Sequence, residues 1–232
     1  MDSFLSAVHH FTVIRVLRSA AHPIDTATLV WTPIVGLLAA IFTICFYFPL
    51  SVFYLPTDVA VIPALVAACW LRGFKPEIDF CRLIDSFFGS EEHPFSVAGT
   101  PGITCLIFAM LFKYVIVRQF FLLESIRLLA FGTLISFVVP LLHPERAIGW
   151  IRCLGIFWLV VSAIAAFSPV KALSSADLLV ALRGPVLASA LIYLCVRLTF
   201  RLADETDCPN IAALPAELSA YLSFMLVRYH FL

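Results

Sequence analysis

The chain has 232 residues, of which 62% are hydrophobic and 13% are charged, and its 15 Lys and Arg residues balance its 15 Asp and Glu residues. Soluble domains are about half apolar and about a quarter charged, so this composition excludes an ordinary soluble domain and indicates a polytopic membrane protein. A net charge of zero argues against a nucleic-acid-binding protein, which would carry a basic stripe. The seven cysteines are scattered without a CxxC pair, which favours buried apolar side chains over disulfides or a zinc site.

The N-terminal segment, residues 1–18, lacks the basic start, apolar core and small-residue cleavage site of a signal peptide. Its pattern predicts instead an amphipathic helix at the membrane interface. The apolar face of that helix would consist of Phe4, Val8, Phe11 and Ile14. The flanking polar residues are His10, Arg15 and Arg18.

Seven apolar segments follow, and a membrane-spanning helix needs about 20 such residues. They run from about Thr28 to Phe48, Val59 to Leu71, Gly102 to Phe121, Ile126 to Leu142, Ile148 to Phe167, Asp177 to Phe200, and Ile211 to Phe231. The second is short, the fourth is marginal, and Arg183, Gly184 and Pro185 predict a kink or break in the sixth. The sequence therefore predicts an all-α membrane helical bundle, one domain over residues 1–232, with about seven transmembrane helices.

The distribution of Lys and Arg predicts the orientation of this bundle. With the N-terminus in the cytoplasm, nine basic residues lie on the cytoplasmic side: Arg15, Arg18, Arg72, Lys75, Arg82, Arg146, Arg152, Arg197 and Arg201. Four lie on the other side: Arg118, Arg127, Lys171 and Arg228. The loop 72–101, the turn 142–148 and the loop 202–210 then all face the cytoplasm, so the acid-rich segments share one membrane surface. The oligomeric state stays open, a homo-oligomer included.

Two charged residues lie within predicted spans at positions that bear on function. Lys113 is in the middle of the third span, and Glu217 is in the first half of the seventh. A charge at this depth usually faces the protein interior. Two interpretations of Lys113 remain open: it is a structural residue that snorkels or pairs with Glu217, or it contacts a substrate phosphate.

The segment RGFKPEIDFCRLIDSFFG, residues 72–89, places Glu77, Asp79 and Asp85 beside apolar spans. On a helix Asp79 and Asp85 would not share a stripe, whereas Glu77 and Asp85 could share a broad face. These acids could form a solvated surface, or they could bind Mg²⁺ together with diphosphate oxygens. The spacing by itself does not decide between the two.

A family resemblance covers nearly the whole chain in order. WTPIVGLLAAIF, residues 31–42, is similar to a family segment F-P-L-(I/V)-G-L-L-x-G, and HPERAIG, residues 143–149, is similar to its (R/E)-E-G-L-G turn. The family next has the run G-G-x-H-x-D-G-x-x-D-x-x-D-G-x-F-G, then the run D-S-R-x-G-x-x-G and a lysine after it. The residues of this chain that match these runs are Gly73, Asp85, Phe88, Gly89, Ser96, Gly99, Gly102 and Lys113. Asp207 and Glu217 match the Asp and the second Glu of its G-D-T-x-G-A-x-x-E-x-x-E segment. On these motifs the chain resembles the cobalamin synthases, the adenosylcobinamide-GDP ribazoletransferases.

The chain also departs from these motifs. At positions where the family has acids, this chain has Ile78, Arg82, Phe95 and Leu214, and at the position of the family's arginine it has Val97. If the alignment is shifted once and the shift is compensated later, Asp79 takes the first acidic position of the motif. Nearby residues that could substitute are the acids Glu77, Glu91 and Glu92 and the cations Lys75 and Arg82.

The resemblance implies an Mg²⁺-dependent enzyme in a bacterial- or archaeal-type cell (inner) membrane. Its substrates would be adenosylcobinamide-GDP and α-ribazole or its 5′-phosphate, with release of GMP. By residue, we predict catalytic roles for Asp85, Asp207 and Glu217, substrate binding by Arg15, Ser96 and Lys113, and metal binding by Glu77, Asp79 and Asp85. Because motif residues are lost, three alternatives stay open: a catalytically degenerate scaffold or binding protein of the same family, a sister nucleotide-diphosphate-alcohol transferase, and an unrelated seven-span protein.

Overall fold

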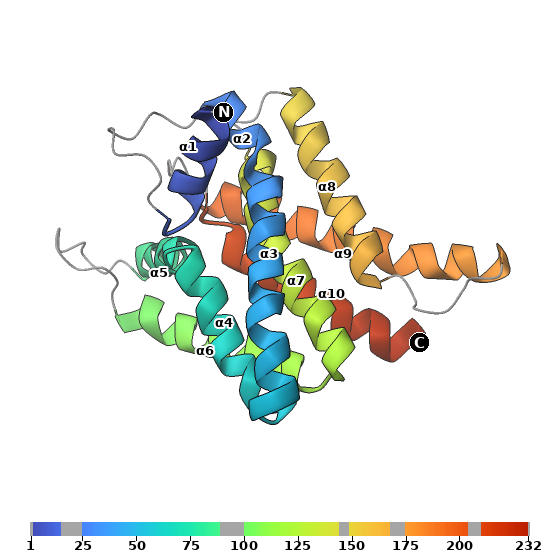
Figure 1. Cartoon of the computed structure of the whole chain (residues 1–232). Coiled ribbons are helices and arrows are strands. Elements are labelled where there is room, and N and C mark those ends of the chain that lie inside the picture. Colours follow the sequence, from blue (N-terminus) through green and yellow to red (C-terminus); the bar gives the residue numbers. More distant parts are fainter. Residues whose placement is uncertain are drawn as a thin grey trace.

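The computed structural model describes residues 2–14, 25–88, 100–143, 149–167, 175–203 and 210–231. The side chains of residues 2, 100, 175–183 and 228–231 are not part of this description. Every regular element in these ranges is helical (Figure 1). The elements are α1 (Asp2–Phe11), α2 (Thr26–Val30), α3 (Thr32–Pro49), η1 (Leu50–Tyr54), α4 (Thr57–Leu71), α5 (Lys75–Phe87), α6 (Thr100–Arg118), α7 (Leu122–Val138), η2 (Val139–Leu142), α8 (Gly149–Phe167), α9 (Ser175–Leu202) and α10 (Ala213–Phe231).

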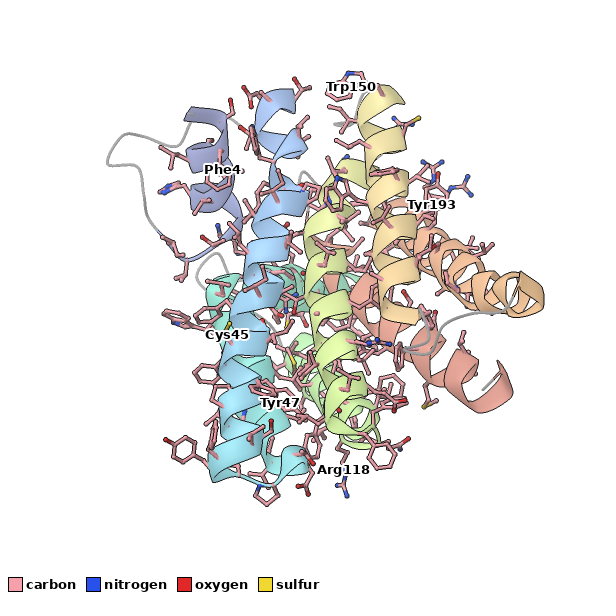
Figure 2. The ribbon with its side chains drawn as sticks, turned by 45° about the vertical axis from the view of Figure 1, so that its right-hand side comes forward. Phe4, Cys45, Tyr47, Arg118, Trp150 and Tyr193 are labelled. Atoms are coloured by element: carbon pink, nitrogen blue, oxygen red, sulfur yellow. The ribbon has the colours of Figure 1, made fainter. Side chains whose placement is uncertain are left out.

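The helices α3, α7 and α8 run side by side, and α9 and α10 cross them at a steep angle (Figure 1). Phe4 and Trp150 lie toward one end of the molecule, and Arg118 lies toward the opposite end (Figure 2). The central helix is α7, which packs against α3, α8 and α10 and is buried over most of its length. The helices packed around α7 therefore leave it little exposed surface.

Glycines allow the closest helix contacts. A Cβ atom at Gly36 of α3 would lie 2.6 Å from the Cβ of Phe137 in α7, and one at Gly132 of α7 would lie 2.3 Å from the ring of Tyr221 in α10. Both distances are shorter than any real contact, so these helices pack at a separation that only glycine permits. Small residues at helix interfaces are typical of membrane bundles, where van der Waals packing drives association.

Five of the described helical segments are long and apolar enough to cross a membrane, and a sixth span results if the bent pair α4–α5 counts as one. The five are Thr32–Tyr54, Pro101–Arg118, Leu122–Leu142, Gly149–Phe167 and Gly184–Leu202. The predicted all-α membrane class agrees with this arrangement, but the predicted count of seven spans is not confirmed. The apolar stretch of α10, Ala213–Val227, is shorter than a span.

The second predicted span corresponds to α4, but the segment after it, predicted as part of the loop 72–101, contains the helix α5. The chain turns by 85° between α4 and α5. Gly73 and Phe74 have φ angles of 66° and 56° and end α4. Glycine adopts this left-handed conformation without cost, whereas a bulky residue such as Phe74 rarely does. In the sixth predicted span, α9 is one continuous helix that contains Pro185. The chain therefore does not break at this proline, and the alternative of a kink stays a prediction.

The predicted N-terminal amphipathic helix corresponds to α1, but its apolar face covers protein. Phe11 is buried, and Phe4 and Val8 pack with it against a cluster from α2, α3 and α7. The rings of Phe4 and Trp31 meet edge to face with their centroids 5.5 Å apart. Ile14, which we assigned to the same face, is exposed instead.

Candidate functional site

The most deeply buried charges of the described chain meet at Arg72, which directly follows α4. Its Nη2 donates a hydrogen bond to Oε1 of Glu77 at 2.7 Å, and its Nη1 donates one to Oε2 of Glu217 at 2.9 Å. Glu77 lies in the first turn of α5, and Glu217 lies in α10. A single guanidinium therefore joins two carboxylates that are 140 positions apart in the sequence (217 − 77).

Lys113 of α6 completes this cluster. Its Nζ lies 2.8 Å from the same Oε2 of Glu217 that Arg72 binds. The hydroxyl of Tyr221, one helical turn after Glu217, donates a hydrogen bond to the other carboxylate oxygen, Oε1, at 3.1 Å. We refer to Arg72, Glu77, Lys113 and Glu217 as the buried ionic cluster.

The charges of the buried ionic cluster cancel. Its two cations and two carboxylates sum to zero, and no member is more than 2% exposed to solvent. Taking one charge into such an interior costs several kcal/mol, so charges at this depth are normally paired and hydrogen-bonded. Three polar atoms of the cluster have no hydrogen-bond partner: Nε of Arg72, Oε2 of Glu77 and Nζ of Lys113, which has its ion pair with Glu217.

The helical turns explain how these side chains converge. Glu77, Cys81 and Asp85 lie four residues apart in α5 and are all buried, because positions four apart share one face of a helix. The 85° turn at Gly73 and Phe74 brings Arg72, directly after α4, next to Glu77 in the first turn of α5. The expectation that Glu77 and Asp85 share a face is confirmed.

Asp85 interacts with the start of α6. Its Oδ1 accepts a hydrogen bond at 2.8 Å from the backbone N–H of Gly102, in the first turn of α6. A Cβ at Gly102 would lie 2.5 Å from the Cys81 carbonyl oxygen and 2.8 Å from Oδ2 of Asp85. The first N–H groups of a helix have no partner within that helix. The carboxylate of Asp85 accepts from one of them and so links α5 to α6.

Asp79 lies on a different side of α5, as its spacing predicts. Its carboxylate is 4.0 Å from Nη1 of Arg82, whose side chain is 57% exposed. Exposed pairs of this kind contribute about 0–1 kcal/mol. Asp79 thus takes part in a surface ion pair.

The described residues do not form the predicted metal site. Among them, no three His, Cys, Asp or Glu side chains come close enough together to hold a metal ion. Glu77 binds Arg72, Asp79 faces Arg82, and Asp85 binds Gly102. Arg15, Ser96 and Asp207, together with Glu91 and Glu92, lie outside the described residues, so their predicted roles stay predictions.

The sequence predicted one ion pair of the buried ionic cluster. The pairing of Lys113 with Glu217, one of the two interpretations of Lys113, is confirmed. Arg72 was assigned only to the cytoplasmic charge count, and its central place in the cluster was missed. The available signal was an arginine directly after an apolar segment and five residues before an acid.

A small cavity of about 10 Å³ lies beside the cluster, which is room for about one water molecule. Arg72, Lys75, Ser136 and Asn210 supply its polar lining. Lys75 also donates a hydrogen bond to the backbone carbonyl of His10, so the last turn of α1 contacts the helix that bears Glu77.

Comparisons of the chain with protein-family models, with curated proteins and with solved structures returned no match.

Proposed function

We propose that this protein is a membrane-embedded transferase of the cobalamin synthase type, in a bacterial- or archaeal-type cell membrane with its acid-rich loops toward the cytoplasm. One observation carries the proposal. Lys113 and Glu217, which match motif positions of the family, and Glu77, a nearby acid that could replace a lost motif acid, come from three helices into one buried ionic cluster. Ionisable side chains held inside a membrane bundle are expensive and usually functional.

The proposed reaction joins adenosylcobinamide-GDP to α-ribazole or its 5′-phosphate. The ribazole hydroxyl oxygen bonds to the phosphorus that stays with cobinamide, the bond from that phosphorus to the bridging oxygen breaks, and GMP leaves with that oxygen. The hydroxyl proton passes to water. Lys113 and Arg72 would bind the diphosphate oxygens, and Glu217 would orient the two cations and the incoming substrate. Positioning and charge neutralisation would supply most of the rate acceleration.

The resemblance implies Mg²⁺, but the described residues do not fit it. Mg²⁺ requires oxygen ligands at about 2.0–2.1 Å in near-octahedral geometry, whereas the predicted acids Glu77, Asp79 and Asp85 have separate partners. We therefore derive no step through a metal ion. Asp207, Arg15 and Ser96 belong to the proposed site on the resemblance alone.

The decisive experiment uses the full chain purified in detergent and incubated with adenosylcobinamide-GDP, α-ribazole and Mg²⁺. Release of GMP is the expected result. Arg82→Gln is a suitable control, because Arg82 is an exposed arginine of α5 that contacts only the neighbouring Asp79 among its described ion pairs. If GMP is not released and no nucleotide binds, the transferase proposal is wrong. Turnover of another nucleotide-diphosphate alcohol without GMP release would identify a sister transferase.

A second candidate is a catalytically degenerate membrane scaffold or binding protein of the same family. The observation that favours it is the closure of the buried ionic cluster, in which both carboxylates are paired and no member is more than 2% exposed. On this proposal the cluster holds α4, α5, α6 and α10 together. The protein would then give no GMP, and loss of Glu217 would change its stability alone.

A further inference from the structure

Two acids with predicted roles at the site bind the same arginine. Glu77 is predicted to bind the metal, and Glu217 is predicted to be catalytic. Both carboxylates lie within hydrogen-bonding distance of the guanidinium of Arg72, at 2.7 and 2.9 Å. Arg72 therefore lies between the two carboxylates that a shared cation would bridge.

The charges balance without a metal ion. A divalent cation would contribute two positive charges against the two carboxylates. Arg72 and Lys113 contribute the same two charges, and both contact Glu217 directly. We infer that the Arg72 guanidinium and the Lys113 ammonium take the place of a divalent cation at this position, so that the centre of the bundle is metal-independent.

The contacts also explain why a cation would not enter. Oε2 of Glu217 already interacts with both Arg72 and Lys113, Oε1 of Glu217 accepts from Tyr221, and Oε1 of Glu77 accepts from Arg72. Of the four carboxylate oxygens of the cluster, only Oε2 of Glu77 remains without a hydrogen-bond partner. A metal ion at that oxygen would lie next to two fixed positive charges, and such repulsion is strong where little water screens it.

The inference predicts that a metal requirement can be created by removing one charge. Arg72→Met leaves Glu77 and Glu217 with Lys113 alone, which gives a net charge of −1, and it opens the space that the guanidinium filled. Arg72→Met combined with Glu77→Gln restores a net charge of zero. Arg82→Gln is the matched control, since it removes an exposed arginine from the same helix region.

The experiment measures thermal unfolding of each purified protein in EDTA and in MnCl₂, together with Mn²⁺ binding by electron paramagnetic resonance. The wild type and Arg82→Gln are expected to bind no Mn²⁺ at this position and to show no change in Tm. Arg72→Met is expected to bind Mn²⁺ and to gain about 5–10 °C in Tm at a concentration about 100 times its Kd. The double variant is expected to lose this response.

Two results would overturn the inference: stoichiometric Mn²⁺ binding by the wild type that Glu77→Gln abolishes, or a folded Arg72→Met protein that shows no response to Mn²⁺. If Arg72→Met does not fold, the wild-type titration decides, because binding that depends on Glu77 contradicts the inference and its absence supports it. No substrate is present in this experiment, so its outcome is independent of GMP release.

Discussion

Replacing Glu217 by Gln isolates the electrostatic role of the buried ionic cluster. The amide has nearly the same shape as the carboxylate and keeps an oxygen that can accept hydrogen bonds from Tyr221 or Arg72. The charge count changes from zero to +1, because Arg72 and Lys113 then share only Glu77. The variant therefore tests charge compensation with little change in packing.

The expected loss is large because the site is closed to solvent. Removing one partner of a buried ion pair destabilises a protein by about 3–5 kcal/mol, since the other charge stays buried and uncompensated. For a chain of this size that loss lowers Tm by about 6–20 °C, at about 2–4 °C per kcal/mol. Lys113→Met should cost a similar amount, because it leaves the opposite net charge of −1.

The double variant Lys113→Met/Glu217→Gln provides the sharper assay. It retains the neutral pair Arg72–Glu77, so its loss of unfolding free energy should be smaller than the sum of the two single losses, with a coupling of about 0.5–3 kcal/mol. The measurement is unfolding by SDS in mixed micelles, followed by circular dichroism. Asp79→Asn is the control and should cost less than about 1 kcal/mol, as expected for an ion pair with an exposed partner. The reasoning is refuted if Glu217→Gln falls within that control range, or if the single losses add.

Three further predictions concern packing and helix starts. Gly132→Ala should lower the free energy of unfolding by about 1–3 kcal/mol through overpacking, because its Cβ would meet the ring of Tyr221 at 2.3 Å; thermal unfolding that matches the wild type would contradict this contact. Asp85→Ala should lower the free energy of unfolding by about 1–3 kcal/mol, because it leaves the N–H of Gly102 without its acceptor. Asp85→Asn keeps an acceptor and should lower it less in the same assay; equal losses would argue against a hydrogen-bonding role. Asp25→Ala should cost about 1 kcal/mol and speed amide hydrogen exchange in the first turn of α2, which Asp25 caps at 2.7 Å; unchanged exchange would show that the cap does not hold this turn.

The amino-acid sequence by itself determined the class of the protein and the position of most helices. Hydropathy and helix propensity act over short ranges, so apolar segments such as those of α3 and α8 could be assigned without knowledge of their neighbours. The pairing of Lys113 with Glu217 could also be anticipated, because a charge in an apolar helix needs a partner. The spacing of Glu77 and Asp85 likewise placed them on one helical face.

The tertiary structure alone decided how these elements are used. The turn at Gly73 directs α5 across the bundle and brings Arg72 between Glu77 and Glu217, and no local pattern contains that information. The partner of a buried charge depends on which helices pack together, and packing joins residues far apart in the chain. For the same reason the sequence could place acids in residues 72–89, whereas only the fold showed that a guanidinium lies between Glu77 and Glu217.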